Sequence, residues 1–221
     1  MSSFPGSLKL IKGGLVILDA ANGAIRRTIA LQYNPDSLSR SYQVQGAGGD
    51  GGAGRAQPFR LKGPAIESIK LDAEIDATDS LEHPDQNANT VAFGIAPQLA
   101  VLESLVNPSS AELLALNALS QSGTLEILPP EAPLVLFVWG KNRVVPVRVT
   151  EFSITEEAFD TALNPMRAKV SLGLRVMTTD DLGFDHRGGG VFINHLRARE
   201  ALAGRTGAAT LQSLGLSSLP L

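Results

Sequence analysis

The stretch LVLFVWGKNRVVPVRVTEFSITEEAFDTALNPMRAKVSLGLRVM, residues 134–177, decides the fold. Its first six residues are continuously apolar, whereas a strand with one wet face alternates apolar and polar side chains. Gly140-Lys141-Asn142 supplies a turn into a second strand at residues 143–154. The last strand alternates strictly from Ala168 to Met177, as half-buried strands do. The stretch therefore predicts three antiparallel strands, the first covered on one face by the core and on the other by a helix or a neighbouring subunit.

The N-terminal half carries similar strand signals. Asn22-Gly23 predicts a tight hairpin between strands at residues 15–18 and 25–33, because a type I′ turn needs positive φ at both central positions. Strict alternation over residues 66–78 predicts a strand with one apolar face and one acidic face. Glycines dominate residues 46–55, which are expected to form a flexible loop. The polar residues after the acidic strand, up to about residue 94, are also expected to form a loop.

Two helices are expected between these groups of strands. Pro97 suits the first turn of one helix, and Ser109 with Glu112 forms the capping box of the other. The chain therefore reads as a mainly β, antiparallel barrel or sandwich over residues 1–183, with a helical insertion at about residues 96–121.

The remaining residues, 184–221, are expected to form a C-terminal arm, helical or flexible. Residues 187–190, Arg-Gly-Gly-Gly, favour a flexible link, and residues 191–203 have the spacing of an amphipathic helix. Arg197 and Arg199 on this helix are interpreted either as solvated surface or as a contact for an acidic partner.

Two patterns resemble chemical sites. Residues 46–54 match G-x-G-x-x-G twice, but a strand follows them and not the helix that a dinucleotide site requires. Asp72, Glu74 and Asp76 share one strand face at a spacing of roughly 7 Å, which is within the range of paired glycosidase acids. A solvated stripe, the lining of a wet lumen or a basic partner explains these carboxylates as well. We therefore expect a protein that is not an enzyme. The alternative is a β-barrel that binds carbohydrate or acts on it.

Composition excludes most other chemistry. The 221 residues include no cysteine, which excludes disulfides and thiol nucleophiles. The three histidines are far apart in the sequence, so we expect no metal site and no cofactor. The formal net charge of −3 does not indicate binding to nucleic acid or to an anionic membrane. No export signal opens the sequence and no apolar run approaches the ~20 residues of a membrane span, so we expect assembly in the cytoplasm.

Two blocks of the sequence resemble the tube-domain proteins of contractile injection systems. The first is Tyr33-Asn34-Pro35 followed by Leu38 and Tyr42, similar to the family signature F/Y-N-P…L…Y. The second runs from Phe137-Val138-Trp139-Gly140 through a strand to residues 159–168, Phe-Asp-Thr-Ala-Leu-Asn-Pro-Met-Arg-Ala. It is similar to the family order F-x-W-G, strand, F-D-x-x-x-x-P-x-R-A. The resemblance covers roughly residues 8–178.

The resemblance implies a tail-tube-like, Hcp-like β-barrel that forms a hexameric ring. Such a ring sits in the baseplate of a phage-tail-like particle, joins the spike hub to the inner tube and initiates tube assembly. The implied partners are further copies of the chain and the tube, spike-hub and other baseplate proteins, in a particle that can be released from the cell. The alternative within this class is the inner tube subunit itself. Many members carry a C-terminal LysM module, and here the arm is expected to dock in its place.

The resemblance also implies structural roles for the block residues, which are expected to fill the barrel, fix its turns and pair charges at its rim. These motif residues are Tyr33, Asn34, Pro35, Phe137, Trp139, Gly140, Phe159, Pro165, Arg167 and Ala168. The candidate interface residues, taken from the doubly covered strand, the acidic face and the arm helix, are Leu134, Leu136, Val138, Asp72, Glu74, Asp76, Arg197 and Arg199.

Overall fold

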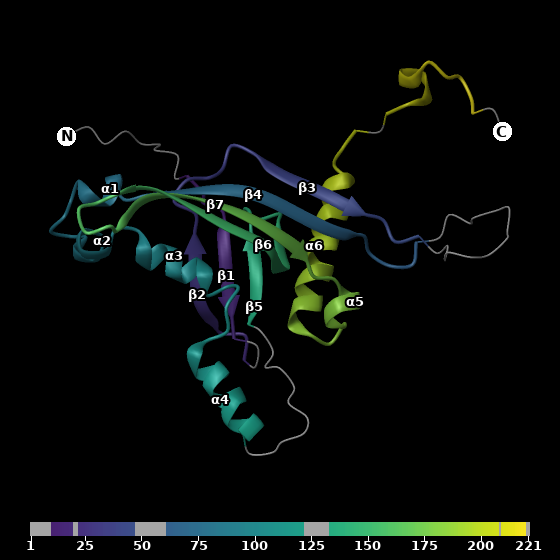
Figure 1. Ribbon diagram of the computed structural model, residues 1–221. Helices are drawn as coiled ribbons and strands as arrows, with labels where there is room; N and C mark the ends of the chain where they lie inside the picture. The colour runs from purple at the N-terminus through teal and green to yellow at the C-terminus, as the bar shows by residue number, and fades with distance from the viewer. Residues whose placement is uncertain (1–9, 20–21, 47–60, 122–132, 208, 220–221) are drawn as a thin grey trace, which may run out of the picture.

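One seven-stranded sheet organises the computed structural model, which describes residues 10–19, 22–46, 61–121, 133–207 and 209–219 (Figure 1). The strand order is β2-β1-β5-β6-β7-β4-β3, and every pairing is antiparallel. The strands are β1 (Gly14–Leu18), β2 (Ile25–Ala30), β3 (Leu38–Gln43), β4 (Ile66–Asp76), β5 (Leu134–Val138), β6 (Val144–Phe159) and β7 (Pro165–Val176). The prediction of a mainly β, antiparallel fold is confirmed. All but the first residue of the predicted glycine-rich loop 46–55 lies outside the described residues.

The long strand β6 divides the sheet into two differently oriented groups. Its first residues pair with β5, and the remainder pairs with β7. A β-bulge between Val149 and Glu151 lies near the start of the part paired with β7, and a bulge bends and twists its strand. β3, β4 and β7 consequently cross over the ends of β1, β2 and β5 (Figure 1). The sheet therefore folds over its own apolar face, as the two layers of an orthogonal sandwich do.

The core lies inside this fold and follows the predicted alternation. Ala168, Val170, Leu172, Leu174 and Val176 of β7 are all buried, whereas the residues between them are mostly more exposed. The first apolar strand, β5, is the centre of the shorter group, and its middle residues 135–137 are buried. Its second face meets a helix of the same chain, because a β carbon on Gly188 would lie 3.1 Å from Leu134 Cδ1. The predicted double covering of this strand is confirmed, and at Leu134 a helix provides it.

Helices lie in the long connection between β4 and β5 and after the last strand. Those in the connection are α1 (Thr78–Leu81), α2 (Ala88–Phe93), α3 (Ala96–Glu103) and α4 (Ser110–Gln121). Those after the last strand are α5 (Thr179–Leu182) and α6 (Arg187–Ala203), followed by a 3₁₀ turn at Leu211–Leu214. The predicted helices at 96–121 are confirmed as α3 and α4. The predicted loop before them is wrong, because α1 and α2 lie there. Tertiary contacts hold this segment: Ile95 is buried, and its N–H donates to the carbonyl of Pro165 at 2.9 Å.

The Asn22-Gly23 hairpin is confirmed, but its turn differs from the predicted two-residue type. Gly23 has φ of +72°, whereas Asn22 does not adopt positive φ. The amide of Asp19 donates to the Ala24 carbonyl at 2.8 Å, so residues 19 and 24 close the turn and the loop between them is longer than two residues. The Asn22 side chain accepts from the Ala24 amide at 2.7 Å and stabilises this longer turn.

The predicted flexible link at residues 187–190 is wrong, because these residues form the first turn of α6. His186 caps the helix by accepting from the Gly188 amide at 3.0 Å. Gly188 and Gly189 are buried against α5 and the residue after it, where only glycine permits so close an approach. Phe192 of α6 joins the core. The division of the chain into a barrel domain and an arm at residue 184 remains a prediction, and α6 on its far side packs against β6.

Two adjacent glycines of α6 provide a test of this packing. A β carbon at Gly189 would lie 2.1 Å from the Gly183 carbonyl oxygen, whereas one at Gly190 would meet nothing within 4 Å. Gly189→Ala is expected to lower the free energy of unfolding by about 1–3 kcal/mol. Gly190→Ala is expected to raise it by up to about 1 kcal/mol, because alanine is the better helix former. Urea unfolding measures both, and equal effects of the two substitutions would contradict this packing.

Candidate assembly surfaces

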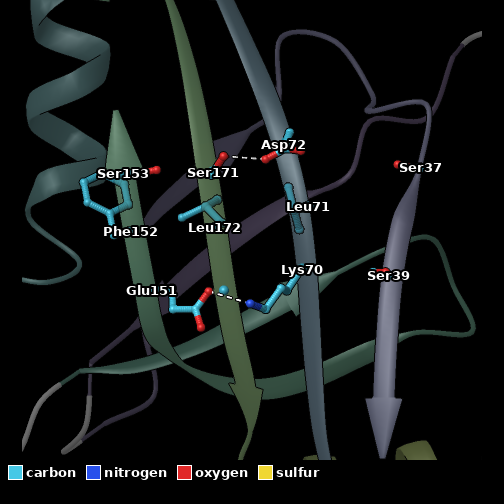
Figure 2. Close-up of a pocket in the computed structure, with 11 residues that line it drawn as sticks. Ser37, Ser39, Lys70, Leu71, Asp72, Glu151, Phe152, Ser153, Ser171 and Leu172 are labelled. Carbon is cyan, nitrogen blue, oxygen red and sulfur yellow. Dashed lines mark hydrogen bonds and ion pairs between the residues drawn. The ribbon is translucent and has the colours of Figure 1, made fainter. Parts of the chain in front are cut away.

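A continuous polar face covers the outer side of β3, β4, β7 and β6. Register places Lys70, Asp72 and Glu74 of β4 beside Gly173, Ser171 and Lys169 of β7. Opposite charges meet across the strands: Lys70 pairs with Glu151 at 2.7 Å, and Lys169 pairs with Glu157 at 3.0 Å. A shallow hollow of about 730 Å³ lies over the middle of this face (Figure 2). The face is therefore polar, and several of its charges are paired within the chain.

Three of the four acidic residues of β4 lie on this face, and each has a partner there. Asp72 accepts from the Ser171 hydroxyl at 2.5 Å, and Glu74 lies 3.8 Å from Arg167. Asp76 accepts from Thr78 and pairs with Arg167 at 2.7 Å. Hydrogen bonds from Thr78, assisted by Arg167, lower the pKa of Asp76. A glycosidase acid requires a raised pKa, so Asp76 is unsuited to that role.

Asp76→Asn is expected to lower the free energy of unfolding at pH 7 by about 1 kcal/mol, because the carboxylate holds both Thr78 and Arg167. The folded-state pKa of Asp76 lies below the unfolded value. Its stabilisation is therefore complete above the unfolded pKa and is lost as the pH falls through the folded pKa. Urea unfolding from pH 7 to pH 3 should show the difference between variant and wild type shrinking. Glu156→Gln, at an exposed position, is the control, and a difference independent of pH would contradict the assignment.

Two strands have an open edge among the described residues. β2 pairs only with β1, and β3 pairs only with β4. Five of the six residues of β2 are exposed, as are four of the six of β3. The outer amides and carbonyls of such strands are a template for pairing with another chain.

The end of β2 and the end of β4 are connected by side-chain hydrogen bonds, and not by strand pairing. Gln32, just after β2, donates to the Asp76 carbonyl at 2.8 Å and accepts from the Asp76 amide at 2.9 Å. A smaller hollow of about 290 Å³ lies beside it, between β2, β4 and α3. Within the described chain the sheet thus approaches closure at this point and leaves its edges β2 and β3 unpaired.

The first sequence block connects three separate segments. The Asn34 side chain accepts from the Gly13 amide and donates to the Ile11 carbonyl, both at 2.9 Å. The Tyr33 hydroxyl donates to Asp79 at 2.7 Å, and this hydrogen bond raises the pKa of Tyr33. Pro35 follows in the connection to β3. The block thereby ties this connection to the chain before β1 and to α1.

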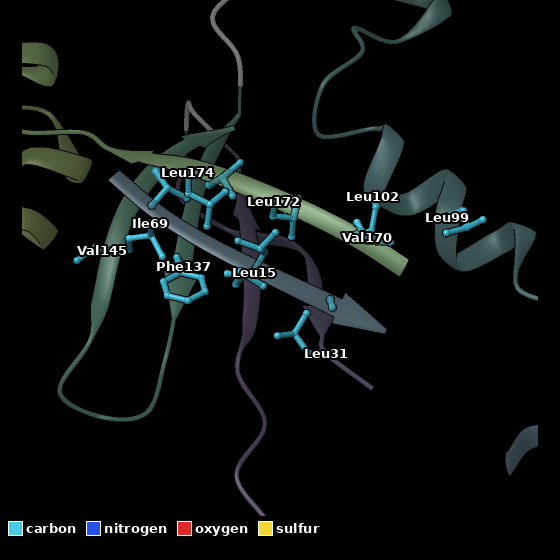
Figure 3. Close-up of a cluster of buried hydrophobic side chains, with 14 of the residues drawn as sticks. Leu15, Leu31, Ile69, Leu99, Leu102, Phe137, Val145, Val170, Leu172 and Leu174 are labelled. Atoms are coloured by element: carbon cyan, nitrogen blue, oxygen red, sulfur yellow. The ribbon is translucent and has the colours of Figure 1, made fainter. Parts of the chain in front are cut away.

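The second block builds a hairpin at the centre of the core. Phe137 is buried in the cluster of core side chains (Figure 3). It stacks on Trp139, with ring centroids 5.8 Å apart. Gly140 has φ of +71°, which allows the chain to reverse, and the Trp139 amide donates to the Arg143 carbonyl at 2.8 Å. Leu136 is buried within the chain, whereas Leu134 and Val138 are partly exposed. An interface role for this strand remains a prediction.

The end of the second block is a turn that sequence patterns only partly specified. Asp160 accepts from the amides of Ala162 and Asn164, and Asn164 donates to the Ala92 carbonyl of α2 at 3.2 Å. Leu163 has φ of +64°. Ala168, after Pro165 and Arg167, is fully buried, whereas Phe159 is 52% exposed. The turn therefore joins β6 and β7 to the helical insertion, a contact that the sequence analysis did not predict.

The two arginines of α6 have different surroundings. Arg197 donates to Asn194 of its own helix at 3.5 Å, whereas Arg199 lies 3.7 Å from Glu67 of β4. Glu67 is buried and also pairs with Arg40 at 2.6 Å. The sequence analysis missed Glu67, although it precedes Ile69 and Leu71 in the inward-facing row of β4.

The described part of the chain contains no group of three or more His, Asp or Glu side chains arranged to hold a metal ion. Among the helices that the structure describes, none has the length and apolar character to cross a membrane.

Comparison with known proteins identifies the family. A sequence model described as contractile injection system tube protein matches residues 17–184. This chain belongs to that family. It is therefore a tube-like structural protein of a phage-tail-like contractile injection particle, and the resemblance of the two blocks is confirmed. No curated protein matches the sequence at a significant level.

A solved structure is also similar to the family member described here. It is the tail of an empty GTA particle with C6 symmetry, 15% identical in sequence, with a TM-score of 0.27. The match covers 74% of this chain and 90% of that chain.

Proposed function

We propose that the protein forms a hexameric ring in the baseplate, joins the spike hub to the inner tube and initiates tube assembly. The observation that carries this proposal is the open sheet, which ends in β2 on one side and β3 on the other. If the β2 edge of one copy pairs with the β3 edge of the next, the contact is heterologous and a rotation that closes gives a ring. Such a ring would leave no strand edge of the sheet exposed.

The polar face is consistent with a water-filled channel inside the proposed ring. Antiparallel sheets commonly have one face on the core and the other in water. Here the wet face consists of serines and of charges that largely pair within the chain, including Lys70–Glu151 and Lys169–Glu157. A lumen lined in this way is hydrated and has little net charge, which suits passage of the inner components of a particle.

Two segments outside the sheet favour the role of an adaptor that contacts other baseplate proteins. α4 extends away from the sheet, and none of its residues is buried (Figure 1). The chain after α6 also extends away and exposes Leu211, Leu214, Leu216 and Leu219. We propose that this segment docks on the neighbouring spike-hub or baseplate proteins. Assembly would take place in the cytoplasm, before any release of the particle.

Deletion of the gene tests the proposal in the producing strain. Negative-stain microscopy of lysates is expected to show neither assembled tubes nor sheaths, and a plasmid copy is expected to restore them. Normal particles that contract and fire without this protein would overturn the proposal.

The inner tube subunit itself is the second candidate, and the description of the family favours it. Loss of particles on deletion is expected for both. The number of copies per particle separates them, because an adaptor contributes one ring and a tube subunit contributes a stack of rings.

A further inference from the structure

Charge is distributed very unevenly along this chain. None of its 19 lysines and arginines lies between residues 71 and 140, whereas 10 of its 22 aspartates and glutamates do. At the protein surface this stretch includes the segment 78–87 around α1, which we call the acidic corner. Its acidic side chains, Asp79, Glu82 and Asp85, are exposed.

Positive charge gathers around Glu67, at the other end of β4. Arg40 and Arg199 both pair with this carboxylate, and both guanidinium groups also lie over the Tyr42 ring, at 5.2 and 5.4 Å from its centroid. Arg143, from the β5–β6 hairpin, completes what we call the arginine cluster: Arg40, Arg143 and Arg199. Burial and the charges of Arg40 and Arg199 lower the pKa of Arg143, while Glu67 opposes this shift.

The arginine cluster has fewer negative partners than positive groups. Within the described residues Arg143 forms no ion pair, and Glu67 is the one carboxylate paired with Arg40 and Arg199. His195 of α6 is buried, and the charges of the arginine cluster act on it together with Glu67. Neither of its ring nitrogens has a hydrogen-bond partner in the described chain. Within the described residues the arginine cluster thus has an excess of positive charge, and His195 beside it has hydrogen-bonding atoms without partners. Arg199 retains 43% side-chain exposure, so an outside group can reach the cluster.

The acidic corner cannot supply this charge within one molecule. β4 carries Glu67 near its start and leads directly into α1, so its 11 residues separate the two features by about 30 Å. Figure 1 shows α1 and α6 at opposite ends of the long strands. A surface and its complement at opposite ends of one chain form a heterologous contact between copies.

We infer that the arginine cluster of one copy binds Glu82 and Asp85 in the acidic corner of a neighbouring copy. This inference rests on the proposed ring and names a contact that holds it together. Complementary charges steer association and fix its register, and a contact of this kind weakens with salt.

Exchange of charges tests the contact in the purified full-length protein. The corner variant is Glu82→Lys with Asp85→Lys, the cluster variant is Arg143→Glu, and the exchanged variant combines all three. Analytical ultracentrifugation at low and high salt is expected to show self-association weakened about tenfold or more in each of the first two. The exchanged variant is expected to recover most of the loss. Glu156→Lys and Arg148→Glu, at exposed positions outside both features, are the matched controls and should associate like the wild type.

The outcomes separate this inference from the proposed function. Rings of the corner variant that form with wild-type strength and salt dependence would overturn the charge contact and leave the ring intact. Failure of the wild type itself to form a ring would overturn both. The corner substitutions are on the surface, so they decide the question even if Arg143→Glu impairs folding. Normal self-association with failure to enter particles would assign the acidic corner to another baseplate protein, and would also overturn the inference.

Discussion

Thr28→Pro in β2 is expected to abolish ring formation and to leave a folded monomer. The Leu31 amide donates to the Gly13 carbonyl across the β1–β2 pair. Because antiparallel pairs alternate, the Thr28 amide, opposite Val16, points away from β1 toward the open edge. Proline removes this donor and places its ring where a neighbouring strand would approach. The dissociation constant of the ring should rise about 100-fold or more.

Thr28→Val is the matched control, because valine keeps both the β-branched shape and the amide donor. Sedimentation should show rings for Thr28→Val and monomers for Thr28→Pro, with similar far-ultraviolet circular dichroism for both. Rings of Thr28→Pro at the wild-type concentration would exclude edge pairing through β2.

Phe137→Ala is expected to have the largest effect on stability, a loss of about 3–5 kcal/mol in the free energy of unfolding. Phe137 is 1% exposed and lies in the core between the two layers of the sheet, stacked on Trp139. Alanine would leave a cavity and remove the stacking partner of the tryptophan. Most domains have only about 5–15 kcal/mol of net stability, so this loss is a large fraction of it.

Phe159→Ala is the control for this substitution. Phe159 belongs to the same sequence block, but its side chain is 52% exposed at the end of β6. Phe159→Ala should lower the free energy of unfolding by less than about 1 kcal/mol, measured by urea unfolding, and should leave the m-value unchanged. Comparable losses for the two phenylalanines would contradict the placement of the core.

Local patterns predicted much of the fold. Alternation identified β4 and β7, because the buried face of a strand repeats every second residue. The capping box predicted at Ser109 is present: Glu112 accepts from the Ser109 amide at 2.7 Å, and the Glu112 amide bonds to the Ser109 hydroxyl at 3.2 Å. These signals depend on residues close in the sequence, which is why the sequence alone was sufficient.

Features that depend on distant contacts were missed. α1 and α2 have weak local signals, and the segment is fixed by the bond from Ile95 to Pro165 across the fold. The glycines of α6 looked like a linker, whereas close packing against the residue after α5 requires them. The partners of Glu67 are distant in the sequence and come together only through the β3–β4 register and the packing of α6.

The candidate surfaces also include features that the sequence predicted and features that only the structure shows. The motif blocks identified the family, because short runs such as Phe137-Val138-Trp139-Gly140 retain their order. Nothing in those runs indicates which strands lie at the edges of the sheet. The edges β2 and β3 emerge only from the complete strand order, and the arginine cluster emerges only from the packed structure.

The copy number of the protein in intact particles tests the central proposal most directly. Quantitative mass spectrometry with isotope-labelled peptides would compare it with the sheath and the main tube protein in purified particles. A baseplate adaptor predicts one hexameric ring per particle, a number independent of particle length. A copy number that rises with tube length, or the absence of the protein from purified particles, would contradict the proposal.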